Sequence, residues 1–468
     1  MKYIVAIFFF LLPFHAFLVT FLKCKIGLNT NFLRFWKEIF LLSFFIYTIF
    51  YVLKRYKYKL SKIYENNYIL WTITTFSLIS LFFIFFPFNF FDYWWALQKG
   101  ENGFLVITKE FLSSDNMKAA FLGFKYDVFF LLAIIIWFYL PVFRKNISLY
   151  LASVFSAIFI ILIIFIPVYF SWYILEFYSF FGYSTEVSTY KANTCLAYSQ
   201  NVEWGHNRFQ ATFWGPIRFS VFLVVFYLLY IAFIFQKNIK NLKLKYLLII
   251  FPSILFFIAL FSAYTKTAIL WFFVWASVFA YLVYRVKFSK TISKTYLTFA
   301  WILASIPIIT LLYIKRDLFL HLWAIINRFE NLKISFEMLG YNMFGHWLGI
   351  AGPASQVGNL INYDAPEQSI YFSGKIHKFL PENWYVQILL EQWILWFSFF
   401  IWIILMLWVY LYRIVKNRRD YLSIWFFSAF IALIFMANFT HSFEESATSY
   451  LFFLLIWAYL WGKIIRSK

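Results

Sequence analysis

Long apolar runs alternate along the chain with shorter polar segments, and their length predicts the secondary structure. Each run has about 17–25 residues, the length that an α-helix needs to cross the hydrocarbon layer of a membrane. A helix also satisfies its backbone hydrogen bonds internally, as lipid requires. The first run lacks a small-residue cleavage site and is expected to stay as a helix. The pattern predicts about twelve transmembrane helices, near residues 3–22, 36–53, 67–87, 127–143, 148–170, 216–235, 246–263, 268–284, 296–314, 385–412, 421–440 and 446–461.

Composition supports the same fold class. Hydrophobic residues make up 63% of the 468 residues and charged residues only 13%, whereas a soluble domain has about 25% charged residues. A soluble protein cannot bury this much apolar surface. We therefore expect an all-α polytopic membrane protein.

The net charge of +21 is concentrated in one set of short loops. These loops and the chain ends contain Glu65 and Asp420 as their only acidic residues, and the remaining loops hold as many acidic as basic residues. Short basic loops face the cytoplasm, so both termini are expected there. This orientation explains the net charge without a nucleic-acid partner. The basic segments are Lys2, 54–62, 144–145, 237–245, 285–294, 413–419 and 463–468.

The other face is expected to be extracytoplasmic and to carry three long loops, near 88–126, 171–215 and 315–384. The cytoplasmic loops are too short for a catalytic domain and contain no Gly-rich phosphate loop, so chemistry is expected outside. The predicted span interiors are almost free of ionisable residues, whereas a transporter would carry charges along its path. Cys24 and Cys195 lie on the outer side, where a disulfide or two separate thiols are both compatible with the sequence.

Three cations of the outer loops are candidates for binding an anion. Arg208 and Arg218 flank Gly215–Pro216, where a helix is expected to begin because proline is tolerated in a first turn. Lys266 is the only charge in a tight turn between two spans. The planar fork of arginine matches phosphate oxygens. The alternative is that the two arginines anchor the helix end at the lipid headgroups and that Lys266 is simply a solvated residue at the loop tip.

The longest polar interval runs from Arg328 to Glu391. Its apolar spacing over 328–339 predicts a short amphipathic helix on the membrane surface. Gly345, Gly349 and Gly352, followed by Pro353, predict a tight turn in which the backbone approaches a neighbour closely. His346 and Glu382 lie at loop–membrane junctions, where burial raises a carboxyl pKa. Glu382 is also placed to cap the helix that begins at Asn383, and His346 to make a structural hydrogen bond.

Five phrases that occur in this order carry a resemblance to a known family. They are R-x-x-A-T-F-x-G-P (208–216), Y-T-K-T-A-I-L (264–270), R-x-E-x-x-K (328–333), F-G-H-x-L-G-x-A-G-P-A-S (344–355) and P-E-N-W-Y-x-Q-I-L-L-E (381–391). Together they resemble the O-antigen polymerase and O-antigen ligase superfamily over about 208–400, and its Wzy-type polymerases most. The family commonly has Ser-Arg where this chain has Thr265–Lys266. Its ligases usually have His before the Asn, where this chain has Glu382.

The resemblance implies a metal-independent glycosyltransferase without a cofactor, on the periplasmic face of a bacterial inner membrane. Its donor would be a glycan on undecaprenyl pyrophosphate, and its acceptor another lipid-linked repeat unit. A chain-length regulator and a flippase are candidate partners, along with membrane lipid. Three segments follow from it: N-terminal helices with two outer loops (1–207), a catalytic core (208–412) and a C-terminal helix pair (413–468).

The resemblance also implies roles for single residues. Charge grows on the leaving pyrophosphate in the transition state, so fixed cations there lower the barrier. Arg208, Lys266 and Arg218 are the candidates for pyrophosphate binding. The candidate catalytic residues are Arg328, Glu382 and His346, the last two as general base. The candidate substrate-binding residues are Asn383, Tyr385, Gly345 and Gly349. No metal ligands are expected.

Two other functions remain open at this point. An O-antigen ligase would transfer the glycan from undecaprenyl pyrophosphate to lipid A-core or protein. A flippase would move a lipid-linked oligosaccharide across the membrane without chemistry.

Overall fold

The computed structural model describes residues 2–28, 35–55, 68–85, 114–139, 146–171, 173–183, 208–237, 239–287, 329, 331–336, 339, 348–349, 351, 383–392, 394–438 and 448–455. These residues form helices and their connections and contain no β-strand. In chain order the elements are α1 (Lys2–Leu11), the 3-10 turn η1 (Leu12–Phe14), α2 (His15–Cys24), α4 (Trp36–Arg55), α6 (Tyr68–Phe85), α9 (Ser114–Tyr139), α11 (Ile147–Phe170), α12 (Ile174–Phe180), α13 (Pro216–Gln236), α14 (Leu242–Ser262), α15 (Lys266–Leu282), the π-helix η3 (Val283–Lys287), α19 (Trp384–Glu391), α20 (Ile394–Arg418) and α21 (Tyr421–Met436).

The described helices confirm a multi-pass, all-α membrane protein. Eight stretches are long and apolar enough to cross a membrane: Lys2–Cys24, Trp36–Lys54, Met117–Ile136, Ile147–Phe170, Pro216–Gln236, Leu242–Ser262, Lys266–Val286 and Ile394–Arg418. Tyr68–Ile84 and Tyr421–Met436 are apolar but shorter. The predicted span 296–314 lies outside the described residues, and 446–461 is described only at 448–455, which is helical. The number of twelve spans stays a prediction.

Two predicted spans differ from the structure. Helix α9 begins at Ser114, not near residue 127, so part of the predicted loop 88–126 is helical. This helix therefore contains Lys125 and Asp127, and the expectation that the span interiors are almost free of ionisable residues is wrong for α9. The predicted span 385–412 is two helices, with Gln392 between α19 and α20. Lys125, Asp127 and Gln392 each have a partner that is distant in the sequence, as described below. These partners compensate the polar groups, which the local sequence pattern had assigned to a loop or to a span.

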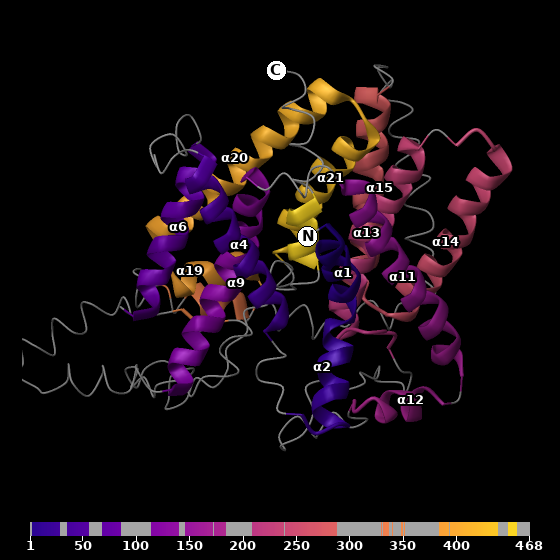
Figure 1. The fold of residues 1–468 in the computed structure, drawn as a ribbon, viewed down its shortest axis with the longest axis horizontal. Helices are drawn as coiled ribbons and strands as arrows, with labels where there is room; N and C mark the ends of the chain where they lie inside the picture. The colour runs from indigo at the N-terminus through magenta and orange to yellow at the C-terminus, as the bar shows by residue number, and fades with distance from the viewer. Residues whose placement is uncertain are drawn as a thin grey trace, which may run out of the picture.

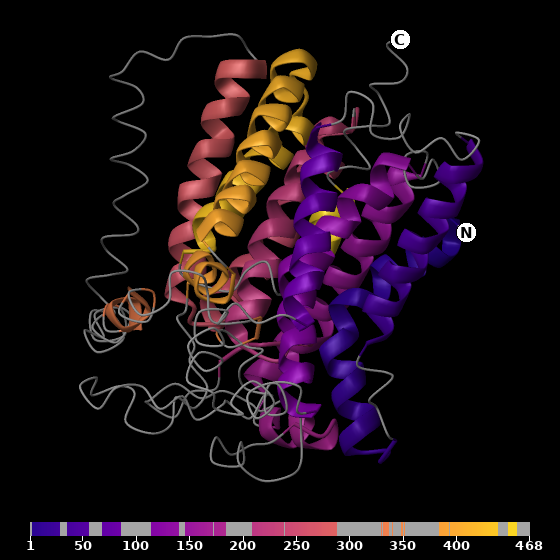
Figure 2. The ribbon, with the colours of Figure 1, turned by 90° about the vertical axis from the view of Figure 1, so that its left-hand side faces the viewer.

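The long helices form two packed groups. Figure 1 shows α4, α6 and α9 on one side of the molecule and α11, α13, α14 and α15 on the other, with α1 and α2 in front. Helix α20 packs on α6 and on α21, and α21 packs on α13 and α15, so this pair of helices joins the two groups. The view in Figure 2 shows α20 alongside the long helices of both groups.

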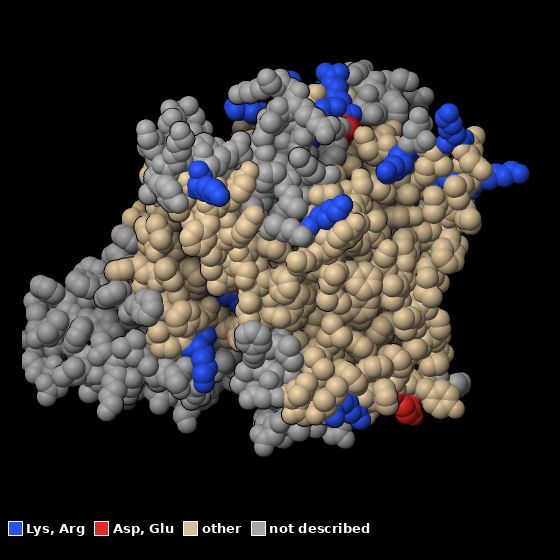
Figure 3. Space-filling view, viewed as in Figure 1, with Lys and Arg blue, Asp and Glu red and all other residues tan. Residues whose placement is uncertain are grey.

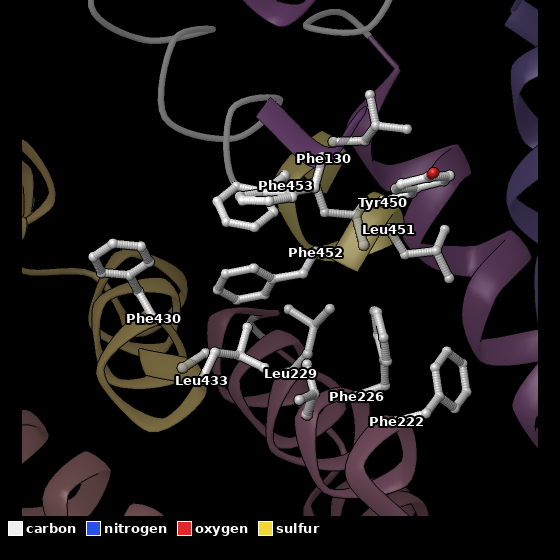
Figure 4. Close-up of a cluster of buried hydrophobic side chains, with 14 of the residues drawn as sticks. Phe130, Phe222, Phe226, Leu229, Phe430, Leu433, Tyr450, Leu451, Phe452 and Phe453 are labelled. Carbon is white, nitrogen blue, oxygen red and sulfur yellow. The ribbon is translucent and has the colours of Figure 1, made fainter. Parts of the chain in front are cut away.

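The centre of the bundle contains the end of the described chain. Residues 448–455 are buried throughout. Figure 4 shows side chains of residues 450–453 between Phe130 of α9 and Leu229 of α13, and the rings of Phe130 and Phe453 lie 5.2 Å apart. One apolar cluster includes residues from all three predicted segments. Close packing of this kind holds helices together in lipid, where apolar burial gives no advantage over the lipid tails.

The two ends of the bundle differ in charge. The backbone N–H of Tyr421 donates to Gln236 Oε1 at 3.3 Å, which places the end of α13 beside the junction of α20 and α21. Lys245 lies over the ring of Phe235 at this same end. Figure 3 shows Lys and Arg side chains gathered along this upper edge, above a broad band that is almost uncharged. We call it the basic end. The start of α13 and the turn between α14 and α15 lie at the opposite end.

Candidate functional site

The polar segment that precedes α13 is buried inside the opposite end of the bundle. We call residues 208–215 the insertion loop. Its residues from Phe209 to Phe213 are buried, and Ala211 has a positive φ of 47°. The hydroxyl of Tyr178 on α12 donates to the carbonyl of Ala211 at 3.2 Å. Burial raises the pKa of Tyr178 above the ordinary tyrosine value, so this hydroxyl stays a donor at neutral pH.

The middle of the insertion loop fills a break in the first transmembrane helix. Pro13 interrupts the helix at η1 between α1 and α2, and such an interruption leaves backbone groups without helical partners. The Thr212 hydroxyl donates to the Pro13 carbonyl at 2.7 Å. The Phe17 N–H donates to the Thr212 carbonyl at 3.1 Å. Thr212 therefore supplies the hydrogen-bond donor and the acceptor that the break in the helix requires. These bonds make the first helix part of the site.

The start of the insertion loop is fixed to the turn before α15. Arg208 donates from Nε to the Ala263 carbonyl at 3.1 Å, and from Nη2 to the Tyr264 carbonyl at 3.4 Å and to Thr265 Oγ1 at 3.2 Å. The Ser220 hydroxyl of α13 donates to the same Thr265 oxygen at 3.0 Å. Lys266, half-buried, is the next residue and the first of α15. The fold thus brings together Arg208 and the turn that carries Lys266, two predicted cations from separate loops.

The other end of the insertion loop carries the third predicted cation. Helix α13 begins at Pro216 with Gly215 as its N-cap, which confirms the predicted helix start. Arg218 lies in the first turn, with its guanidinium carbon 5.8 Å from the centre of the Trp214 ring. A cation in the first turn of a helix faces the positive end of the helix dipole, and Lys266 has the same position in α15. An anion bound there would relieve the repulsion at both sites.

The predicted substrate-binding residues of α19 make contacts within the protein. The Asn383 side chain caps α19 by accepting hydrogen bonds from the N–H groups of Tyr385 at 3.0 Å and Val386 at 3.1 Å. The Tyr385 hydroxyl donates to the Ile434 carbonyl of α21 at 2.7 Å. These bonds explain why an Asn and a Tyr occur at the two positions, and substrate binding by either residue stays a prediction.

A buried amide lies on the same helix. Gln387 is completely buried, and neither of its side-chain polar atoms has a hydrogen-bond partner in the described structure. Leaving such a group unpaired costs about 1–3 kcal/mol. Gln387 is a polar residue of the α19 motif that the sequence interpretation did not select.

Gly349 confirms the predicted close approach of the backbone, and the neighbour is helix α9. The residue has φ +82°, and a Cβ built on it would lie 2.2 Å from the carbonyl oxygen of Ala119. A Cβ on Gly123 of α9 would in turn lie 2.6 Å from the Gly349 nitrogen. The N–H of Ala351 donates to Glu391 Oε1 at 3.2 Å. This part of the predicted outer loop 315–384 is therefore attached to both α9 and α19.

Several charged and polar side chains inside the bundle were missed by the sequence interpretation. Gln392 donates to Asp127 and accepts from the Ser80 hydroxyl at 3.3 Å. Glu38 pairs with Lys125, with 2.9 Å between Oε1 and Nζ. The available indications were Lys37–Glu38 at the start of one predicted span and Lys125–x–Asp127 across the start of another. Each of these patterns taken singly is also typical of a loop boundary.

Four predicted site residues lie outside the described residues: Arg328, Glu382, His346 and Gly345. The predicted surface helix is described at 331–336, where Leu332 and Ile334 pack on Val386 and Leu390 of α19 while Phe336 is exposed. Cys24 is disulfide-bonded, and the other cysteine of the chain, Cys195, lies outside the described residues. Among the residues described, no group of three or more His, Cys, Asp or Glu side chains could hold a metal ion.

Comparisons of the chain with protein-family models, with characterised proteins and with solved structures found no match.

Proposed function

We propose that this protein is a membrane-embedded glycosyltransferase that polymerises undecaprenyl-pyrophosphate-linked repeat units into O-antigen or a related surface polysaccharide. The observation that carries the proposal is the position of Arg208, Lys266 and Arg218. Arg208 and Arg218 lie at the two ends of one buried loop, and Lys266, distant in the sequence, follows the turn to which Arg208 is hydrogen-bonded. Arg208 and Lys266 belong to two of the motifs on which the resemblance to O-antigen polymerases depends, and Arg218 lies two residues after the first of them.

In the proposed reaction, a hydroxyl of the acceptor sugar attacks the anomeric carbon of the donor glycan. The bond from that carbon to the pyrophosphate oxygen breaks, and the pyrophosphate leaves with the bonding electrons. The hydroxyl proton passes to a general base, for which Glu382 and His346 are the candidates. Cations that are already held in place stabilise the charge on the leaving group without reorganising, and this lowers the barrier.

We propose that the end with the insertion loop faces the periplasm and that both termini are cytoplasmic. Two observations support this orientation. Basic residues concentrate at the opposite end of the bundle, as they do on the cytoplasmic side of membrane proteins. Cys24, in a disulfide, lies at the end of the first helix farthest from Lys2, and disulfides persist in oxidising compartments.

Transport of the lipid-linked glycan is a second candidate, and the charges inside the bundle favour it. Asp127 of α9 and Glu38 of α4 are buried, at 0% and 5% exposure, and such residues in transporters mark substrate or proton pathways. However, Asp127 is hydrogen-bonded to Gln392 and Glu38 is paired with Lys125. Both carboxylates have partners that explain their burial, so we favour the transferase.

A gene deletion followed by gel analysis of the surface glycan tests the proposal. Loss of a polymerase leaves lipid A-core that carries a single repeat unit. Loss of a ligase leaves bare core while lipid-linked polymer accumulates, and loss of a flippase leaves bare core with lipid-linked single units. An unchanged glycan would contradict all three functions.

Complementation of the deletion with single variants then tests the site. We expect wild-type protein and Lys240→Ala, which changes a lysine at the basic end, to restore the full ladder of chain lengths. Lys266→Ala should insert normally and give core with one repeat. Full ladders from Lys266→Ala would contradict the assigned role in stabilising the pyrophosphate.

A further inference from the structure

A second group of cations surrounds Trp214, and most of it lies outside the region that carries the resemblance. Lys37 Nζ is 5.9 Å from the centre of the Trp214 ring, and the Arg218 guanidinium carbon is 5.8 Å from it. The two cations lie in the first turns of α4 and α13. The tryptophan therefore joins the ends of two helices that are far apart in the sequence, and both dipoles favour an anion nearby.

Lys125 of α9 brings a third cation to this group through a shared carboxylate. Glu38 Oε1 lies 2.9 Å from Lys125 Nζ and 3.8 Å from Lys37 Nζ. The side chains of Lys37 and Glu38 are each 6% exposed, and that of Lys125 is 14% exposed. Buried ions of one sign raise the electrostatic cost of folding unless counter-charge is close. Glu38 thus holds Lys37 and Lys125 close together, beside the tryptophan that Arg218 also contacts.

His15 provides an independent indication that something binds here. Its ring centre is 5.7 Å from that of Trp214 and 5.8 Å from that of Trp36. The residue is 5% exposed, and neither of its ring nitrogens has a hydrogen-bond partner in the described structure. A neutral imidazole carries one N–H donor and one acceptor nitrogen, and buried polar groups of native proteins are almost always paired. A ligand with oxygen acceptors would take the N–H.

We propose that Lys37, Lys125, Arg218 and His15 form a binding site for the diphosphate group of a polyprenyl-linked substrate. The inference rests on the proposed function and adds the N-terminal helices to it. The lysines provide compact charges, the arginine a fork that matches two phosphate oxygens, and the imidazole a neutral donor. The membrane-length helices around the site are apolar enough to lie beside a polyprenyl chain. Polymerisation uses two lipid-linked substrates, and Arg208 with Lys266 lies at the other end of the insertion loop.

The site is tested by binding of farnesyl pyrophosphate, a short lipid diphosphate without sugar, to the purified full chain in detergent. Isothermal titration calorimetry should give a Kd that rises about tenfold or more in Lys37→Gln and in Lys125→Gln. Lys243→Gln changes an exposed lysine at the basic end and should bind like the wild type. An unchanged Kd in both buried-lysine variants would overturn the proposal.

The Glu38→Gln variant separates an anion site from a purely structural ion-pair cluster. Removing the negative charge of Glu38 should leave the Kd for farnesyl pyrophosphate equal or lower. A weakening as large as in the lysine variants would mean that the ion pairs only hold the helices together, and would overturn the site. If a lysine variant does not fold, the wild type still decides the question. Farnesyl pyrophosphate must raise its thermal unfolding midpoint, and no rise overturns the proposal.

Further ligands identify the source of the diphosphate. Inorganic pyrophosphate and farnesyl monophosphate are each expected to bind more weakly than farnesyl pyrophosphate. Equal binding of phosphatidylglycerol vesicles, with the same loss in Lys125→Gln, would overturn the assignment to a diphosphate.

The test is separate from that of the transferase, because farnesyl pyrophosphate carries no glycan. Lost binding in Lys125→Gln with a normal polysaccharide ladder would contradict the link to polymerisation, while the diphosphate site would stand. Unchanged binding with a lost ladder would overturn the site and leave the transferase proposal standing.

Discussion

Two segments that connect long helices enter the helix bundle, and they are held there by different forces. The insertion loop is fastened by hydrogen bonds, from Thr212 to the break at Pro13 and from Arg208 to the turn before α15. The segment around Gly349 is held mainly by close approach, since its backbone lies directly on that of Ala119 in α9.

The difference explains which residue types the two segments need. Hydrogen bonds fix the insertion loop at several points along its length, so the cations at its ends keep defined positions. The Gly349 segment depends on the absence of a side chain, because backbone that touches backbone leaves no room for one. The insertion loop thus needs side chains that donate and accept hydrogen bonds, whereas the Gly349 segment needs a residue that has no side chain.

Among the variants that test this difference, Gly349→Ala is expected to cause the largest loss of stability. The new methyl would meet the Ala119 carbonyl at 2.2 Å, and φ +82° is itself strained for alanine. Left-handed strain and overpacking together should lower the free energy of unfolding by about 3 kcal/mol or more. Unfolding by SDS titration in mixed micelles measures the change.

Gly27→Ala is the matched control for this variant. Gly27 also has a positive φ, of 72°, but a Cβ there would meet nothing within 4 Å. It should cost only the left-handed strain, about 1 kcal/mol. Equal losses in the two variants would show that contact with α9 contributes nothing to the role of Gly349.

A smaller effect is expected when the hydrogen-bonded segment loses Arg208. Arg208→Ala removes three bonds to the turn before α15, and bonds from a charged donor contribute about 1.5–3 kcal/mol each before the turn relaxes. We expect a net loss of about 2–3 kcal/mol in the same titration, and no polymer. The exposed Arg285 serves as control, and Arg285→Ala should change neither result.

Arg208→Lys separates charge from geometry. It keeps the cation but loses the fork that reaches both Ala263 and Thr265. Stability close to that of Arg208→Ala, rather than to the wild type, is expected. Full wild-type stability in Arg208→Lys would contradict the account of how this segment is held.

Local rules account for what the sequence predicted correctly. Pro216 marks the start of α13, and the glycines around Gly349 indicate a close backbone contact, because each depends on the residue's own conformational limits. Arg208 and Lys266 were selected as cations of predicted outer loops, and the fold brings Arg208 to the turn that carries Lys266. The roles of Arg328, Glu382 and His346 stay predictions, since these residues lie outside the described part of the chain.

Partners distant in the sequence account for what was missed. Lys125 was assigned to a loop and Asp127 to the very start of a span, yet both lie within α9, where Glu38 and Gln392 compensate them inside the bundle. The first helix was not expected near the site, because nothing close to Pro13 indicates that Thr212 will fill its break. Pairing of this kind depends on tertiary structure, which hydrophobic periodicity does not contain.

Thr212→Val is expected to cause the smallest loss of stability. It is also the variant that acts most specifically on the contact with the first helix. Valine keeps the shape of threonine but cannot donate to the Pro13 carbonyl, which lies 2.7 Å from the Thr212 hydroxyl. An acceptor left unpaired in a buried site costs about 1–2 kcal/mol. Thr212→Ser retains the hydroxyl and should recover most of the loss in the SDS titration. If serine and valine destabilise equally, packing of the threonine methyl, and not the hydrogen bond, joins the insertion loop to the first helix. His15 of the proposed diphosphate site directly follows the break that Thr212 fills. Its position would then depend on the packing of the threonine methyl.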